Sequence, residues 1–443
     1  MTRSTRLFAP ATRLAAMTSK RDRYVDFLRV ISIAVVVVGH WLMAVVSYRG
    51  GTFSGHNALE IISGLWIATW VLQVMPLFFF VGGFSNFVGW RSAQGKGHSY
   101  QDFVRSRVER LMRPTLVFIG IWLVGASALY SMAHIDAQRL SLVLALVAKP
   151  LWFLAVYVLV VTLAPAMARL HLSYGIRVPV VLGLGAVAVD FCRLAFDLEM
   201  VGYLNFAFVW LTAHQLGFFY ADGSLLRLSG KVFAGIATLS LVALVVLTTV
   251  GPYSPFMVGG AAVKASNNSP PSVCLIALSL WLIALAMLLR TRLSEWLQSQ
   301  RVWTGVIVLG SRIMTVFLWH LTALFIGAFV LYRAGFPQPP AGTSDWWLLR
   351  PVWIVALIPV LIPFVAVLGR FEKPTGSATA PARPRRAMPG VALLVLGLAG
   401  LAEFGFDMTS SVGVGPTPLM SALCAGAGYV LVHSRRAEKE MWR

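Results

Sequence analysis

The sequence predicts an all-α fold, a polytopic transmembrane helical bundle of about twelve spans. Two observations lead to this prediction: 58% of the 443 residues are hydrophobic and only 12% are charged, and the apolar residues fall in runs long enough to cross about 30 Å of hydrocarbon. The net charge of +20 would suit a nucleic-acid partner only if the basic residues shared a folded polar surface. They lie between the apolar runs instead, so membrane topology explains them and no nucleic-acid partner is predicted.

The apolar runs set the order of the predicted elements. A span needs about 20 residues, and slightly shorter runs also qualify. A shorter apolar piece, 140–148, is predicted to be re-entrant or interfacial. The predicted spans are 27–48, 61–89, 113–132, 151–168, 178–196, 203–220, 232–250, 272–289, 304–332, 346–369, 389–406 and 416–433.

The loops predict the orientation and the domain boundaries. With the N-terminus in the cytoplasm, the cytoplasmic loops hold most of the 37 basic residues, as the positive-inside rule requires. We therefore expect a multi-pass protein of the cell membrane, in contact with lipid, with both termini cytoplasmic. The expected parts are a disordered cytoplasmic tail (1–20), a ten-helix transmembrane domain (21–374), a linker rich in Pro, Gly and small residues (375–388) and a C-terminal helix pair with its tail (389–443).

The first predicted span, in "RDRYVDFLRVISIAVVVVGHW", carries ionisable residues, which are expensive in a membrane and often functional. Arg29 and His40 are eleven residues apart, about three full turns, and therefore share one helix face. Asp26 lies three residues before Arg29, beside the same stripe. The stripe predicts an anion-binding entrance at Arg29 and an imidazole about 16 Å deeper. The alternative is that Arg29 reaches lipid headgroups while His40 is a satisfied packing residue.

Two further histidines lie well inside predicted spans. His320, in "FLWHLTALF", is predicted at a depth similar to that of His40, so the two residues can border one cavity. A structural role for His320, hydrogen-bonded to a neighbouring helix, is an equal alternative. His214, in "LTAHQLGFF", is expected to be structural.

Arginines recur every three residues in "VRSRVERLMRPTL", at Arg107, Arg110 and Arg113. On a helix they form a ridge at the inner membrane interface, and guanidinium groups bind phosphate in a bidentate manner. Anchoring to anionic lipid is the alternative.

Trp152, in "KPLWFLAVYVL", fits an interfacial anchor, and the small residues of "MPLFFFVGGFSNFVGW" fit helix packing. The three cysteines are far apart in the sequence, so neither a metal site nor a disulfide framework is predicted.

Together these motifs resemble, in order, those of the acyltransferase 3 family of integral membrane acyltransferases. The shared pattern is D-x-x-R with a mid-helix histidine, F-F-x-x-G-F, R-x-x-R, W-F-L and a late L-W-H, and it extends over residues 20–374 to the closing "GRFEKP". The family transfers acyl groups, often acetyl from acetyl-CoA, to hydroxyl groups of glycans, lipid-linked sugars, peptidoglycan or natural products. The resemblance therefore implies a bacterial membrane O-acyltransferase, with acetyl-CoA or another acyl-CoA as donor and no metal. Its acceptor would be a hydroxyl group of a glycan, a glycolipid or another envelope or natural-product molecule.

The resemblance also assigns roles to residues. His40 matches the essential histidine, and Arg29 and Asp26 belong to the same motif. Arg110 and Arg113 match the R-x-x-R pair that faces the CoA phosphates, while Trp152 and His320 match further family positions. On this basis we expect His40 to be the base, or to carry the acyl group briefly. Asp26 would orient Arg29, and His320 would bind the acceptor or polarise the carbonyl group.

Two features depart from the family pattern. The usual Ser-Gly-Phe of the second helix reads Gly82-Gly83-Phe84, and the chain carries two extra C-terminal helices but not the appended hydrolase-like domain of some members. We therefore expect it to use either its membrane core alone or a separate extracytoplasmic transferase as partner. A twelve-helix secondary transporter is the alternative function. Against it, the loop "RSAQGKGHSYQDF" lacks the Gly-Asp-Arg-Gly pattern common in major facilitator transporters. A non-catalytic scaffold would leave the stripe from Arg29 to His40 unexplained.

Overall fold

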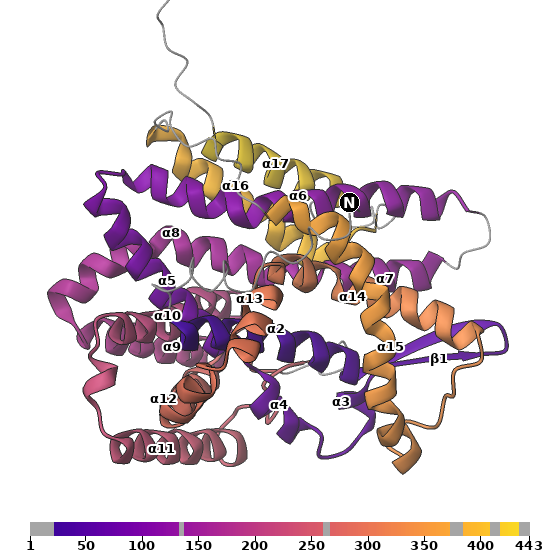
Figure 1. Cartoon of the computed structure of the whole chain (residues 1–443), viewed down its shortest axis with the longest axis horizontal. Helices are drawn as coiled ribbons and strands as arrows, with labels where there is room; N and C mark the ends of the chain where they lie inside the picture. Colours follow the sequence, from indigo (N-terminus) through magenta and orange to yellow (C-terminus); the bar gives the residue numbers. More distant parts are fainter. Residues whose placement is uncertain (1–21, 133–136, 260–265, 373–383, 408–416, 434–443) are drawn as a thin grey trace, which may run out of the picture.

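The computed structural model describes residues 22–132, 137–259, 266–372, 384–407 and 417–433. The predicted N-terminal tail, most of the predicted linker and the last ten residues lie outside these ranges. The elements, in chain order (Figure 1), are α2 (Arg23–Met43), β1 (Ala44–Arg49), β2 (Thr52–Asn57), α3 (Ala58–Ile61), α4 (Trp66–Leu72), α5 (Met75–Gly95), α6 (Tyr100–Tyr130), α7 (Ala137–Ala148), α8 (Leu151–Tyr174), α9 (Arg177–Ala195), η2 (Glu199–Leu204), α10 (Asn205–Ala221), η3 (Leu225–Arg227), α11 (Gly230–Thr249), α12 (Val273–Trp296), α13 (Gln300–Gly310), α14 (Ile313–Arg333), α15 (Ser344–Leu368), η4 (Gly369–Glu372), α16 (Pro384–Phe404) and α17 (Pro418–His433).

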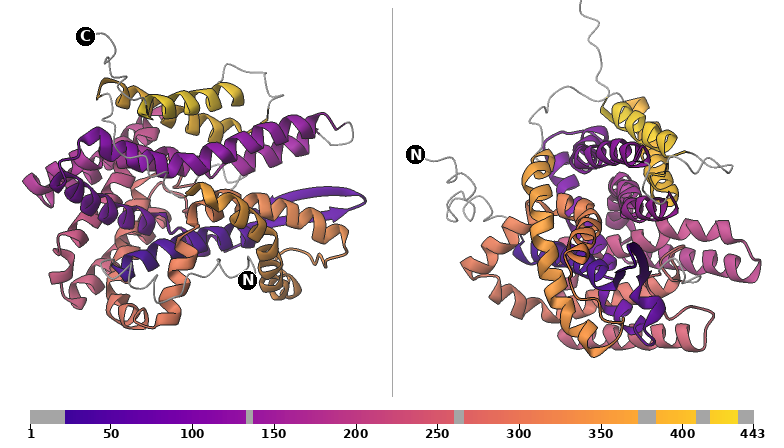
Figure 2. Two further views of the ribbon diagram at one scale, coloured as in Figure 1. Left: turned by 45° about the horizontal axis from the view of Figure 1, so that its top comes forward. Right: turned by 90° about the vertical axis from the view of Figure 1, so that its right-hand side faces the viewer.

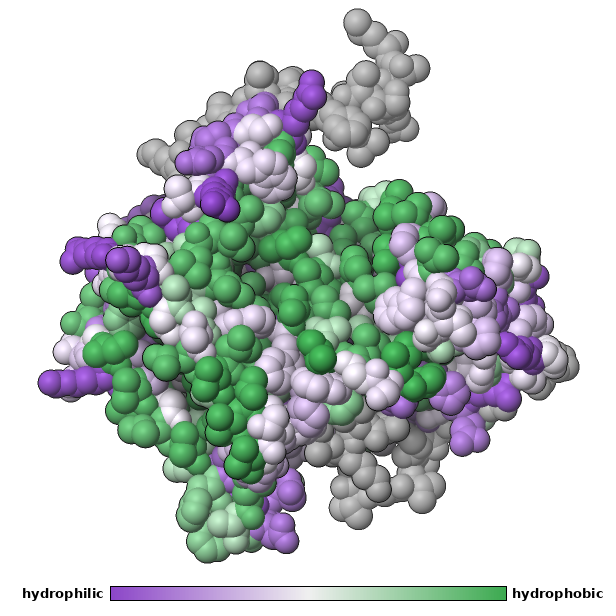
Figure 3. Space-filling model, turned by 90° about the horizontal axis from the view of Figure 1, so that it is seen from below, coloured by the Kyte–Doolittle hydropathy of each residue, from purple (hydrophilic) through white to green (hydrophobic). Residues whose placement is uncertain are grey.

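The fold is a polytopic helical bundle, as predicted. In the described ranges, ten helical stretches are long and apolar enough to cross a membrane. Two of the predicted spans fall below that length: α10 has 17 residues and α17 has 16. In Figure 3, hydrophobic residues cover the middle of one face and hydrophilic residues gather toward both ends, as expected of a bundle surrounded by lipid.

The first helix ends earlier than predicted. The span expected over 27–48 stops at Met43, and the chain continues as an antiparallel β-hairpin of β1 and β2. The sequence of β1, "AVVSYR", favours a strand because β-branched and aromatic side chains suit a pleated surface. Gly50 and Gly51 form the two-residue turn with φ angles of 56° and 77°, which glycine adopts readily. The hairpin projects from one end of the bundle (Figure 2).

Helix α5 packs very closely on α10. A Cβ atom on Gly83 would lie 1.9 Å from the backbone oxygen of His214, and one on Gly217 would lie 2.0 Å from that of Phe80. Small residues at both positions therefore let the two backbones touch. This contact fixes the polar residues that follow Gly83 on α5 against the rest of the bundle.

Two predicted segments differ in their helix boundaries from the structure. The short piece predicted at 140–148 is the helix α7, which meets α8 at Lys149-Pro150. The span predicted over 304–332 is divided into α13 and α14 between Gly310 and Ile313. The start of α14 is held by Glu372 of η4, which accepts hydrogen bonds from the Thr315 backbone N–H and hydroxyl group.

The C-terminal pair, α16 and α17, packs on the side of the bundle formed by α6, α7 and α8 (Figure 2). The Phe406 ring contacts the rings of Phe118 and Trp122. The Tyr130 hydroxyl donates a hydrogen bond to Asp407 at 2.5 Å. The pair therefore shares a hydrophobic core with the helices before the linker.

Candidate active site

Two histidines from different helices meet inside the bundle. His40 lies in the last turn of α2, and His320 lies on α14. His40 Nδ1 is 2.7 Å from His320 Nε2, and the two ring planes differ by only 9°. His320 is fully buried, whereas His40 keeps an exposed surface. His40 is therefore the member of the pair that presents surface, while the buried His320 contacts only its neighbours.

The hydrogen bonds of His320 determine the proton positions in both neutral rings. His320 Nδ1 lies 2.6 Å from the carbonyl oxygen of Phe317, and because a carbonyl oxygen only accepts, this nitrogen carries the proton. Nε2 of His320 is then an acceptor, so His40 Nδ1 donates to it. His40 Nε2 keeps its lone pair, the state that a general base or a nucleophile requires.

Charged residues gather about three turns away along α2, some 16 Å from His40. Arg29 donates from Nη1 to Asp26 Oδ1 and from Nη2 to Ser85 Oγ, each at 2.8 Å. Arg107 of α6 donates from Nη2 to the backbone oxygen of Ser85 at 3.2 Å. Ser85 of α5 therefore joins α2 to α6, and it brings two guanidinium groups to one place.

Tyr157 of α8 lies near these charged residues. The charges of Arg29, Arg107 and Arg110 all act on its hydroxyl group, and we call these four residues the arginine cluster. Asp26 is the carboxylate paired with Arg29, and neither Arg107 nor Arg110 forms an ion pair within the described ranges. The cluster therefore carries an excess of positive charge, which suits a ligand with several phosphate groups.

Gly82 makes room for the Tyr157 side chain. A Cβ atom at Gly82 would lie 2.9 Å from Tyr157 Cε2 and 3.1 Å from its hydroxyl oxygen. Asn86, one turn further along α5, is hydrogen-bonded to Tyr157 and donates to Nε2 of the fully buried His214 at 3.1 Å. Glycine and asparagine on the same helix thus fix the position of the tyrosine.

An aromatic layer separates the arginine cluster from the histidine pair. The Phe153 ring lies 5.6 Å from the Tyr157 ring and 5.3 Å from the Phe317 ring, centroid to centroid. The backbone oxygen of Phe317 in turn accepts the hydrogen bond that His320 donates from Nδ1. The two polar groups are therefore connected by packed side chains, and the region between them is apolar.

The structure brings some predicted site residues together and separates others. His40 and His320 are in contact, and Arg29 and Arg110 share the arginine cluster. Asp26 lies beside Arg29, about 21 Å along α2 from His40, so it does not reach the histidine pair. In the described ranges, no group of three His, Cys, Asp or Glu side chains could hold a metal ion.

Arg113 and Trp152 lie apart from both polar groups. Arg113 is rotated by about 120° around α6 from Arg107, and its charge acts on Tyr429 of α17. The Trp152 ring packs 6.0 Å from Phe206 and 6.3 Å from Trp210. Trp152 therefore belongs to the aromatic layer and not to the arginine cluster.

Sequence reasoning gave no site role to Ser85 or Tyr157, and it placed Arg107 only on the ridge. Tyr157 is a hydroxyl-bearing residue inside the apolar run "WFLAVYVL", and this feature alone could have indicated a polar role for it. Ser85 supplies a hydroxyl one turn after Gly82, where the family pattern has its serine. The partners of both residues lie on other helices, so their roles become visible only in the folded chain.

One of three comparisons with known proteins finds a match. A family model described as an acyltransferase domain matches residues 22–370, well over half of the chain. No curated protein and no solved structure matches the sequence.

Proposed function

Since the chain belongs to the acyltransferase 3 family, we propose that this membrane acyltransferase takes an acyl group from acyl-CoA, with acetyl-CoA as the first donor to test. The acceptor is a hydroxyl group of a glycan, a glycolipid or another envelope or natural-product molecule. The observation that carries the proposal is the hydrogen bond from His40 to His320. It leaves the lone pair of His40 Nε2 free on the exposed member of the pair.

The arginine cluster is the proposed donor site. Arg29, Arg107 and Arg110 offer guanidinium groups with little compensating negative charge, and such groups pair well with phosphate oxygens. The phosphates of CoA would lie at the cluster and its thioester near His40. The separation of about three helical turns along α2 is then spanned by the extended arm of the coenzyme, beside the aromatic layer.

In the proposed reaction, His40 Nε2 removes the proton from the acceptor hydroxyl group. The hydroxyl oxygen attacks the thioester carbonyl carbon, a new C–O bond forms and the C–S bond breaks. The departing thiolate receives the proton from His40, so protons and electrons balance. While His40 is protonated, His320 Nε2 still accepts its Nδ1–H, which keeps the ring oriented and shares its charge. A positioned imidazole contributes about 10²- to 10⁴-fold in rate.

The proposal is tested on two separate properties of the full chain. Purified protein should bind CoA in a calorimetric titration, and cells that express it should contain envelope lipids or glycans with the mass increment of an acetyl group. His40→Ala should keep CoA binding and lose the increment. Normal acetylation by a folded His40→Ala protein would refute the role of His40.

The same experiment separates the acyltransferase from the secondary transporter. A transporter would move a solute across vesicles without any dependence on CoA, and it would leave envelope molecules unmodified. Solute flux together with an absence of CoA binding would therefore favour transport.

A further inference from the structure

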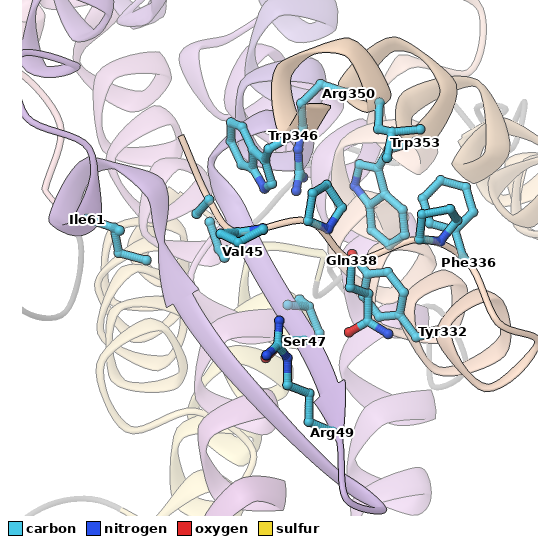
Figure 4. A pocket seen from close by; sticks show the side chains of 16 residues that line it. Val45, Ser47, Arg49, Ile61, Tyr332, Phe336, Gln338, Trp346, Arg350 and Trp353 are labelled. Carbon is cyan, nitrogen blue, oxygen red and sulfur yellow. The ribbon is translucent and has the colours of Figure 1, made fainter. Parts of the chain in front are cut away.

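A pocket of about 360 Å³ opens at the hairpin end of the bundle. Its walls come from β1, from the end of α14, from the proline-rich turn that follows and from the start of α15. Figure 4 shows the Arg350 side chain between the rings of Trp346 and Trp353. The residues that matter for its chemistry are Arg49, Tyr332, Gln338, Trp346, Arg350 and Trp353. The volume is within the range of small-molecule sites.

The pocket walls are positively charged. They contain two arginines, Arg49 and Arg350, and no acidic residue; Asp345 faces a neighbouring, shallower groove. Arg350 is only 6% exposed, yet no ion pair of the described ranges includes it. It donates from Nη1 to the Ala44 backbone oxygen at 3.2 Å and is hydrogen-bonded to Tyr332. A buried guanidinium group has five donors and normally pairs with an anion, so this one favours an anionic ligand.

The same walls offer flat aromatic surfaces. The Arg350 guanidinium lies 3.9 Å from the Trp346 ring centroid, and the Trp353 and Tyr332 rings are stacked at 5.1 Å. The buried indole N–H of Trp353 has no hydrogen-bond partner among the described residues. Gln338 accepts a hydrogen bond from the Tyr48 backbone N–H through Oε1, which leaves its amide N–H₂ to donate. Aromatic faces beside polar donors suit a ring with an apolar face and many oxygen atoms.

The pocket adjoins the end of α2 that carries His40. The residue bound by Arg350, Ala44, donates its own N–H to the backbone oxygen of His40. His40 and Ala44 are four residues apart, about 6 Å along the axis. The arginine cluster lies on the other side of His40, about 16 Å along the same helix. His40 therefore stands between two positively charged regions at opposite ends of α2.

We propose that this pocket is the acceptor subsite and that it recognises a sugar bearing an acidic group. A carboxylate or phosphate of the sugar pairs with Arg350 and Arg49, and the sugar ring packs against the aromatic walls. A hydroxyl group of the bound molecule is thereby held beside the end of α2 that presents His40. This inference rests on the proposed function, because only a transferase needs an acceptor there.

The test compares charged and neutral sugars of the same shape. Full-length protein in detergent is titrated with glucose, glucuronate and glucose 1-phosphate, and the change in tryptophan fluorescence reports binding. We expect at least one of the two anionic sugars to bind about tenfold more tightly than glucose, the effect of a single charge-assisted hydrogen bond. Preference for glucuronate alone identifies a carboxylate acceptor, and preference for glucose 1-phosphate alone identifies a phosphorylated one.

Variants at this end of the bundle locate the binding. Arg49→Gln changes an exposed side chain and should reduce the preference to less than about threefold. Arg333→Gln is the matched control, because Arg333 lies over Phe329 and Tyr48 and does not line the pocket. Arg350→Lys keeps the charge but loses the planar fork, so it should weaken anionic sugars more than glucose. Equal binding of all three sugars, or equal losses in Arg49→Gln and Arg333→Gln, would overturn the proposal.

Binding of CoA to the same samples separates this inference from the proposed function. If CoA binds and the sugars show no charge preference, the acceptor inference is wrong and the transferase proposal stands. If the charged sugars bind and CoA does not, the pocket is an anion site and the transferase proposal fails.

Discussion

His40 Nδ1 and His320 Nε2 lie 2.7 Å apart in nearly coplanar rings. The other ring nitrogen of His320, Nδ1, donates a hydrogen bond to the backbone oxygen of Phe317. This chain of two hydrogen bonds runs from the buried backbone of α14 to the exposed ring of α2. Its direction is set by the carbonyl oxygen, which can only accept. The consequence is a single reactive nitrogen, His40 Nε2.

Replacing His320 tests whether it positions His40. His320→Ala should lower kcat about 10- to 100-fold and leave the KM for acyl-CoA unchanged, because the ring of His40 loses its orientation but the arginine cluster is intact. His320→Gln should recover part of the rate, since its amide oxygen can accept from His40 Nδ1. The acidic limb of the pH–rate profile should also move in His320→Ala. Equal rates and profiles in the Ala and Gln variants would contradict a positioning role.

Replacing His40 should remove the chemical step. We expect His40→Ala and His40→Asn each to lower kcat by about 10²- to 10⁴-fold with an unchanged Kd for CoA, because the general base is lost and the donor site is not. His98→Ala, in an exposed loop, is the matched control and should behave like the wild type. Kinetics and calorimetry on the same preparations measure both quantities.

The sequence was sufficient for the parts of the fold that depend on local patterns. Apolar runs of span length predict most of the helices, because each run must cross the hydrocarbon core. The boundary errors have physical causes: β1 follows directly on α2 without a break in hydrophobicity, so the end of the helix at Met43 is hidden in an apolar run. Likewise, α13 and α14 together look like one span.

The site was predictable only in part, for a similar reason. Helical spacing places Arg29 and His40 on one face, and this periodicity needs no knowledge of other helices. The choice between Arg107 and Arg113 depends on which neighbours α6 meets, namely α5 on one side and α17 on another. Tyr157 becomes a site residue because Gly82, on a helix distant in sequence, leaves space for its ring. Such contacts have no local signature.

The arginines of α6 should differ in their effect on donor binding. Arg107→Ala and Arg110→Ala should each raise the Kd for CoA about tenfold, since each removes a charge from the group around Tyr157. Arg113→Ala should have a smaller effect, because its charge acts on Tyr429 of α17 and does not act on Tyr157. Calorimetric titration at two salt concentrations measures both affinity and charge dependence.

An exposed arginine elsewhere provides the control for this comparison. Arg227→Ala, in η3, removes the same charge away from the site and should bind CoA like the wild type. If Arg113→Ala weakened CoA binding as strongly as Arg110→Ala, the family motif would describe the donor site better than the arrangement around Tyr157.

Substitutions of two glycines of α5 test different roles: Gly83 serves the packing of α5 on α10, and Gly82 makes room for Tyr157. Gly83→Ala places a methyl group 1.9 Å from the His214 backbone oxygen, so α5 and α10 must move apart and the stability of the bundle should fall by about 1–3 kcal/mol or more. Gly82→Ser, which restores the usual serine of the family, meets the movable end of the Tyr157 side chain instead. It should leave the melting temperature nearly unchanged and weaken CoA binding severalfold by displacing Tyr157. Gly120→Ala, where nothing lies within 4 Å of the new methyl group, is the control for both. Thermal unfolding and CoA titration of the three variants measure the two effects independently. A Gly83→Ala protein as stable as Gly120→Ala would show that the close contact of α5 and α10 is not required.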